Sequence, residues 1–322
     1  MRIGGTWRAY AKALCVATIF AGGIGAATAA GAQEPEVGSQ DPPATPVEDI
    51  LVEGRARSAE QVDRAARDFV NDVTDPPRGR GVARWRRAVC VGVANLNREL
   101  AQAIVDRVSS VASDVGLEIG EPGCEANILI VATDDGVAMA TAMVEARYRA
   151  FRDPHIAGTS HSNRRLELFR SSVRPVKWWH VTLPIVADTG ALAVRVPGAS
   201  ADSGAVARTV SSLLRTPIRY DMLRAFIVVD LAQTDGMSAD QLSDYIAMVA
   251  LAQIDPDADT SGHDTILNLF LADADPPLGM TSWDRSYLHA LYSVELNQSA
   301  PNAQTGAIGS EMSRDRRGLN QE

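Results

Sequence analysis

The chain has 322 residues, of which 46% are hydrophobic and 22% are charged, and its formal net charge at pH 7 is −9. This acidic balance argues against nucleic acid as a partner, because phosphates favour clusters of Lys and Arg. Beyond the first 32 residues no segment is long and apolar enough to span a bilayer, so we expect a soluble protein without a transmembrane segment.

The first 32 residues have the order of a secretory signal peptide. Three basic residues and no acidic one occupy positions 1–12, an apolar run follows at 13–27, and small residues fill 30–32. This order predicts removal after Ala32 and a periplasmic or secreted product. The alternative is a membrane anchor, which needs a longer and more strongly apolar run of ~20 residues.

Residues 33–57 are predicted to be a flexible leader. Their first part is rich in Pro, Ser, Gly and acidic side chains, and too poor in apolar groups to bury a core. The strand-like run 49–55 resembles the energy-coupling box of TonB-dependent outer-membrane receptors, which would add a strand to a partner's sheet. The alternative is an edge strand of this domain, so the role of the run stays open.

A helix is predicted after the leader, followed by a linker, over residues 58–80. Ser58 and Gln61 have the spacing of a capping box, and Val62, Phe69 and Val70 recur on one helical face. A Pro-Pro step at 76–77 ends this helix. We expect the element to pack on the domain that follows it.

A βαβ unit is predicted between residues 88 and 132. Two apolar runs, 88–94 and 128–132, have the continuity of strands that are covered on both faces, and a helix with three- and four-residue apolar steps lies between them. Gly116 stands where the helix needs a residue of positive φ. A crossover helix implies parallel strands and a right-handed connection.

Cys90 and Cys124 are the two cysteines that would remain after removal of the signal peptide. An isolated pair in an oxidising compartment forms a disulfide, and neither cysteine has the Cys-x-x-Cys spacing of a redox or metal site. The βαβ unit places both at the same end of the sheet. We therefore expect a Cys90–Cys124 disulfide, which would stabilise the fold by about 3 kcal/mol.

Polar side chains follow the second strand, and a basic segment comes after the next helix. Asp135 stands where α/β proteins build sites, and also where a helix needs an N-cap acceptor. We favour the cap, because no second titratable group is visibly paired with this aspartate.

Residues 152–175 are basic and irregular, and we expect a solvated loop there.

Residues 177–184 alternate as a strand, with a possible hairpin partner at 192–196. Trp178 and Trp179 are adjacent, so their rings point to opposite faces of the sheet. With His180 they could line a groove for a sugar or a peptide, or they could close the edge of a core. Both interpretations stay open.

A buried helix and its neighbours resemble half of a known enzyme family. Ser238 with Gln241 fits a capping box, and helix 241–254 is apolar around much of its circumference. The order of a strand at 225–230, this helix, an aspartate-rich loop and a final helix is similar to the metal-site half of metzincin zinc peptidases. The run also resembles a secreted Gram-negative family of unknown function with a degenerate form of that helix. The resemblance implies a zincin-like scaffold.

The positions that would hold zinc carry other side chains. When Ala250-Leu251 is matched to the small-Leu step that follows the second ligand, Tyr245 and Val249 replace the two histidines and Ile246 replaces the general-base glutamate. A register shifted back by one residue offers Asp244, Tyr245 and Met248, which is no better. Catalytic zinc needs about three protein ligands and a base for its water. The resemblance therefore implies a scaffold without zinc peptidase chemistry, a pseudoenzyme.

The aspartate-rich loop could bind calcium instead. Carboxylates that alternate along a loop can wrap a hard cation, and the chain offers Asp255, Asp257, Asp259 and Asp264. Against this, the loop lacks the glycine and the glutamate that an EF-hand has at its sixth and twelfth positions. The alternative is a turn whose side chains satisfy its own backbone.

The sequence as a whole predicts one α+β domain over 81–297, with a mixed sheet and a zincin-like arrangement. Thr281 and Asp284 fit a cap for the last helix, and the polar tail 298–322 is expected to fray. We expect a non-enzymatic binding or structural protein of the cell envelope, with an envelope protein or peptide as partner and no cofactor other than calcium. The alternatives are a hydrolase with an unrecognised active site and a calcium-stabilised module.

Overall fold

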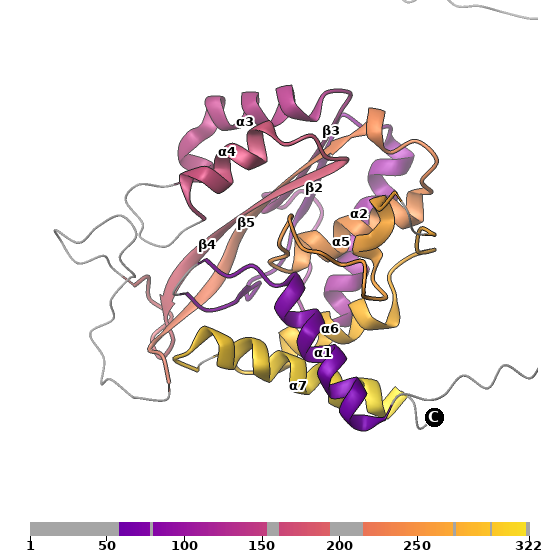
Figure 1. Cartoon of the computed structure of the whole chain (residues 1–322). Helices are drawn as coiled ribbons and strands as arrows, with labels where there is room; N and C mark the ends of the chain where they lie inside the picture. The colour runs from indigo at the N-terminus through magenta and orange to yellow at the C-terminus, as the bar shows by residue number, and fades with distance from the viewer. Residues whose placement is uncertain are drawn as a thin grey trace, which may run out of the picture. The chain divides into compact units, whose positions relative to one another are not determined.

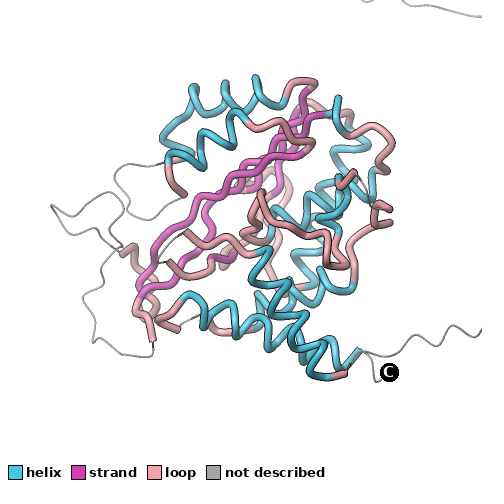
Figure 2. The backbone as a smooth tube through the Cα atoms, viewed as in Figure 1, coloured by secondary structure: helices cyan, strands magenta, loops and turns pink. Residues whose placement is uncertain are grey.

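The structure is a computed structural model that describes residues 58–77, 80–152, 161–193, 215–272, 275–296 and 298–319. The expected signal peptide, the leader and the run 49–55 lie outside these residues. Within them the chain is mixed α and β, with helices on both faces of one sheet (Figures 1 and 2). None of the described helices is long and apolar enough to cross a membrane.

The sheet is built around one long strand. Strand β5 pairs with β4 in antiparallel along one edge, and with β1 and then β3 in parallel along the other; β2 pairs with β3 in parallel. The mixed sheet of the sequence analysis is therefore confirmed. The strands are β1 (Ala83–Arg84), β2 (Val91–Ala94), β3 (Ile128–Thr133), β4 (Val176–Val186) and β5 (Ile218–Asp230).

The predicted βαβ unit is present. Helix α2 (Arg98–Asp114) joins the parallel strands β2 and β3, and Gly116 after it has a φ of 81°. Cys90 and Cys124 form the expected disulfide, with their Cα atoms 6.1 Å apart. Strand β2 was expected to be covered on both faces, but all four of its residues are half-buried, because β2 is the edge strand beside β3.

Two hydrophobic clusters lie on opposite faces of the sheet. The larger contains α2 and the buried helix α5 (Ala239–Leu251), together with α6 (Ser282–Ser293). The smaller lies under α3 (Gly136–Phe151) and α4 (Asn163–Ser171) (Figure 1). Local signals set the helix starts: capping boxes form at Ser58, Ser238 and Thr281, and Asp135 caps α3 by accepting from the Ala138 amide. The cap interpretation of Asp135 is confirmed.

One local expectation is wrong. The segment 152–175 is not an irregular loop throughout, because α4 forms within it: Ser162 caps the helix, and Leu166 and Phe169 bury one face. Strand β4 pairs with β5, and the described start of the expected hairpin return lies against β4 through an antiparallel bridge between Ile185 and Leu192 and a hydrogen bond from the Ala193 amide to the Pro184 carbonyl. Residues 194–196 of that return lie outside the described residues.

The expectation that the tail 298–322 frays is also wrong. Instead of fraying, residues 301–319 form helix α7 (Pro301–Leu319), which packs on α1 (Ala59–Val73) and α6. Ile308 and Met312 are fully buried in the larger cluster, and Gly309 lets the α1 backbone approach closely at Arg67. The domain therefore extends beyond the expected limits of 81–297, since α1 and α7 both contribute to its core.

Replacing Ile308 with Ala tests whether α7 belongs to the core. We expect the free energy of unfolding to fall by about 3 kcal/mol, because the change leaves a cavity at a fully buried position. Urea unfolding followed by circular dichroism measures this. The matched control is Ser310→Ala on the exposed side of the same helix, which should change stability by less than about 0.5 kcal/mol. Equal effects of the two variants would contradict the packing.

Candidate functional site

Helix α5 carries the positions that correspond to zinc ligands in the resemblance. Tyr245, Ile246 and Val249 are all buried, with exposures of 7%, 0% and 0%. The one carboxylate on the buried part of this helix, Asp244, pairs with Arg107 and accepts a hydrogen bond from the Met280 amide. Its charge is therefore used to hold α5 against its neighbours.

Trp178, Trp179 and His180 lie on β4 and are buried on alternating faces. The Trp178 indole donates to the Ile254 carbonyl over 2.9 Å in the larger cluster. The Trp179 indole donates to the Phe151 carbonyl over 2.9 Å in the smaller cluster. His180 Nε2 donates to the Val249 carbonyl over 2.8 Å. The three side chains thus close the core, and their edges also line a small cavity beside β4.

The four candidate calcium ligands do not converge. Asp255 and Asp257 pair with arginine, while Asp259 accepts hydrogen bonds from the backbone and hydroxyl of Ser261. Asp264 contributes its backbone carbonyl to Thr281. Among the described residues no three His, Cys, Asp or Glu side chains are grouped as a metal site would require.

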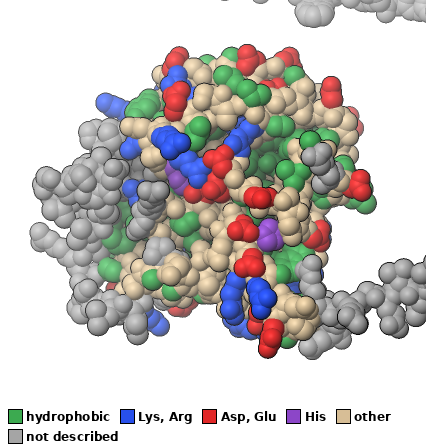
Figure 3. Space-filling model, in the orientation of Figure 1, with side chains coloured by type: hydrophobic (Ala, Val, Ile, Leu, Met, Phe, Trp, Pro, Cys, Tyr) green, Lys and Arg blue, Asp and Glu red, His purple; other side chains and the backbone are tan. Residues whose placement is uncertain are grey.

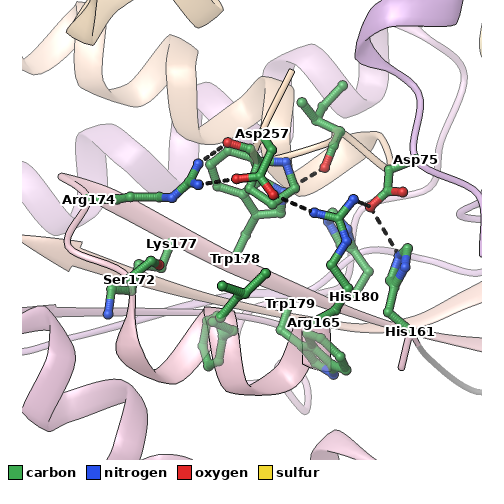
Figure 4. A pocket seen from close by; sticks show the side chains of 14 residues that line it. Asp75, His161, Arg165, Ser172, Arg174, Lys177, Trp178, Trp179, His180 and Asp257 are labelled. Atoms are coloured by element: carbon green, nitrogen blue, oxygen red, sulfur yellow. Dashed lines mark hydrogen bonds and ion pairs between the residues drawn. The ribbon is translucent and has the colours of Figure 1, made fainter. Parts of the chain in front are cut away.

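Instead, the loop belongs to an ion-pair chain that crosses the small cavity (Figure 4). Arg165 on α4 lies at its centre, 3.2 Å from Asp75, 3.0 Å from Asp255 and 2.9 Å from Asp257. We call this network the Arg165 chain. Its charged members are Asp75, Arg165, Asp255, Asp257 and Arg174, and the imidazole of His161 lies 3.5 Å from Asp75 at its end.

Burial changes the proton affinity of this region. The pKa of Asp75 rises to about 6, chiefly because the carboxyl is desolvated and also because Asp255 and Asp257 lie nearby; Arg165 opposes the rise. Desolvation lowers the pKa of His161 to about 3 and that of His180 to about 4. Both imidazoles are therefore neutral at pH 7.

A larger cleft opens on the other side of Arg165. Its volume is about 660 Å³, and its apolar wall consists of Pro76, Pro77 and Leu168. Basic, acidic and histidine side chains gather on this face of the molecule (Figure 3). The arginines that line the cleft are Arg80, Arg152, Arg164 and Arg165.

Two arginines of the cleft have no carboxylate partner among the residues that the structure describes. Arg152 donates to neutral acceptors, the His161 carbonyl over 3.4 Å and Asn163 Oδ1 over 2.5 Å. Within the described parts of the chain, neither Arg152 nor Arg164 forms an ion pair with a carboxylate. The cleft is also lined by Asp75 and Asp257, which pair with Arg165 and Arg174, so no described carboxylate offsets the charge of Arg152 and Arg164.

This cleft is not predicted by the local sequence pattern. Arg164 and Arg165 were assigned to a solvated loop, and Asp75 to a linker. The available signal was the run of basic residues in 152–175, within an otherwise acidic chain. Nothing local to that run shows that Arg165 meets a carboxylate 90 residues away in the sequence.

Comparisons of the chain with family models, curated proteins and solved structures give no match. The function has therefore to be inferred from the chemistry of the site itself.

The buried histidines and Asp75 predict opposite pH effects. A histidine whose folded pKa is lowered stabilises the fold above its ordinary value of 6.5, and this stability is lost as the pH falls towards 4. For His180 the loss should reach about 2 kcal/mol at pH 5. Asp75, whose pKa is raised, contributes stability that is fully present below 3.8 and lost as the pH rises through 6.

Urea unfolding between pH 8 and pH 4.5 tests this assignment. His180→Gln should lower stability at pH 8 yet flatten the decline below pH 6.5, whereas Asp75→Asn should make that decline steeper. Parallel stability curves for the wild type and both variants would show that these groups do not titrate as described.

Proposed function

We propose that this protein is an exported, non-enzymatic binding protein of the cell envelope, whose ligand places clustered carboxylates or phosphates in the arginine-lined cleft. The observation that carries the proposal is a pair of arginines, Arg152 and Arg164, that lie in a cleft of about 660 Å³ and have no carboxylate partner among the described residues. The chain as a whole has a charge of −9, so this local excess of positive charge runs against its composition.

The position of the arginines on α4 supports an anionic ligand. Arg164 and Arg165 lie in the first turn of this nine-residue helix, which has no acidic residue there. The partial positive charge at a helix N-terminus disfavours cations, so Arg164, which has no carboxylate partner among the described residues, costs stability there, whereas Arg165 is paired with three carboxylates. An anion would be held by the guanidinium groups of Arg152 and Arg164, which can bind carboxylate or phosphate in bidentate fashion.

The same contacts favour an anion over calcium as the ligand. Arg165 already occupies the space between Asp255 and Asp257, the first two candidate calcium ligands. A divalent cation between these carboxylates would have to displace the guanidinium or accept its repulsion. Calcium binding by the aspartate loop is therefore not part of the proposal.

Export and the absence of catalysis complete the proposal. The order of basic, apolar and small residues in 1–32 supports export, and the Cys90–Cys124 disulfide suits an oxidising compartment such as the periplasm. Tyr245, Ile246 and Val249 carry phenol and aliphatic groups, which cannot hold a catalytic zinc ion. On a zincin-like scaffold, these side chains therefore favour binding over peptide hydrolysis.

Calorimetric titration of the mature protein with citrate and with pyrophosphate tests the cleft. The double variant Arg152→Gln/Arg164→Gln should bind the preferred anion at least about tenfold more weakly, because it loses two charge-assisted contacts. The tighter of the two probes indicates whether the ligand offers carboxylates or phosphates.

The matched control is Arg147→Gln/Arg149→Gln, which removes the same charge from exposed positions on α3 outside the cleft. This control should bind the anion as the wild type does. The proposal fails if neither probe binds the wild type, or if both double variants weaken binding equally.

A further inference from the structure

A second cavity lies next to the Arg165 chain, and the anion proposal does not use it. Its volume is about 180 Å³, and it shares Arg174, Trp178, Ile254 and Pro256 with the small cavity beside β4. Most of its remaining wall is apolar. We call it the Tyr245 pocket, and the residues of its wall that matter below are Arg174, Trp178, Tyr245, Asp255, Ala258 and Phe270.

The walls of the Tyr245 pocket are held in place by contacts of their own. The Tyr245 ring packs edge-on against Phe270 of the 3₁₀ helix η2 (Ile266–Phe270), with the ring centroids 4.9 Å apart. It also packs edge-on against Trp178, with the ring centroids 6.1 Å apart. The hydrogen bond from the Trp178 indole to the Ile254 carbonyl holds the indole in place against the residue that follows α5 in the wall. Because α5, β4 and η2 each supply a wall, the cavity is part of the folded core and needs no movement to form.

The hydroxyl group of Tyr245 is the one polar feature of α5 on this cavity. The residue is 7% exposed, and no described residue forms a hydrogen bond with its hydroxyl. Desolvation raises its pKa, so the group stays protonated and can donate. The hydroxyl is not among the fully buried polar atoms that lack a partner, so it can reach water, and a bound acceptor would take the place of that water.

We propose that the Tyr245 pocket binds a single uncharged aromatic ring that bears an acceptor oxygen, such as an aryl amide, with the Tyr245 hydroxyl as donor. The volume suits one ring, since an apolar cavity of roughly 150 Å³ can hold benzene. The charges at its rim compensate each other, because Arg174 pairs with Asp257 and Asp255 pairs with Arg165. A neutral group therefore fits better than an ion. This site goes beyond the anion cleft and does not depend on it.

Ligand-observed NMR titration of the mature protein with benzamide and with toluene tests this site. Both probes carry one ring, but only benzamide has an acceptor oxygen. Tyr245→Phe should weaken benzamide binding about fivefold, the effect of one neutral hydrogen bond, and leave toluene binding unchanged. Ala258→Leu fills the cavity from its rim and should abolish binding of both probes, whereas Leu278→Ala, at a side chain that is 93% exposed, should change neither.

The proposal is overturned if benzamide does not bind the wild type, or if Tyr245→Phe affects benzamide and toluene alike. Thermal unfolding of each variant shows that the fold is kept, and the preference of the wild type for benzamide over toluene requires no variant. Arg152→Gln/Arg164→Gln should bind benzamide normally, and Tyr245→Phe should bind citrate or pyrophosphate normally. Failure of one site is thereby distinguished from failure of the other.

Discussion

The antiparallel pairing of β4 with β5 is the constraint on which the rest of the structure depends. Because side chains alternate along a strand, this register sends Trp178 into the larger hydrophobic cluster and Trp179 into the smaller one. Each indole then donates to a backbone carbonyl of the layer that covers it, at Ile254 and Phe151. A slip of one residue would exchange the two rings and break both hydrogen bonds, so one strand pair fixes both helical layers.

The candidate site follows from that arrangement. The layer above Trp179 carries α4 and therefore Arg165, and the layer beside Trp178 ends in the loop that carries Asp255 and Asp257. The two layers meet at the edge of β4, where Arg165 joins them through three carboxylates (Figure 4). The ion-pair chain separates an arginine-rich cleft from an apolar pocket. One edge of the sheet thus offers two chemically different surfaces.

Features that depend on residues adjacent in sequence could be predicted, whereas features that depend on contacts between distant residues could not. The capping boxes and Gly116 were found because each needs only a few adjacent residues. Helix α4 was missed because its short apolar face has just Leu166 and Phe169 buried among charges, and α7 because its buried Ile308 lies in a polar run. The pairing of β4 with β5 and the contacts of Arg165 join residues that are far apart in sequence, which local patterns do not encode.

Amide hydrogen exchange of the protein with and without a polyanion tests the central claim, that the cleft at the start of α4 is the binding site. With citrate or pyrophosphate present, the account predicts slower exchange at 161–168, where the ligand would lie against the first turn of α4 and its arginines. Protection that is spread evenly over the protein, or confined to segments away from α4, would contradict it.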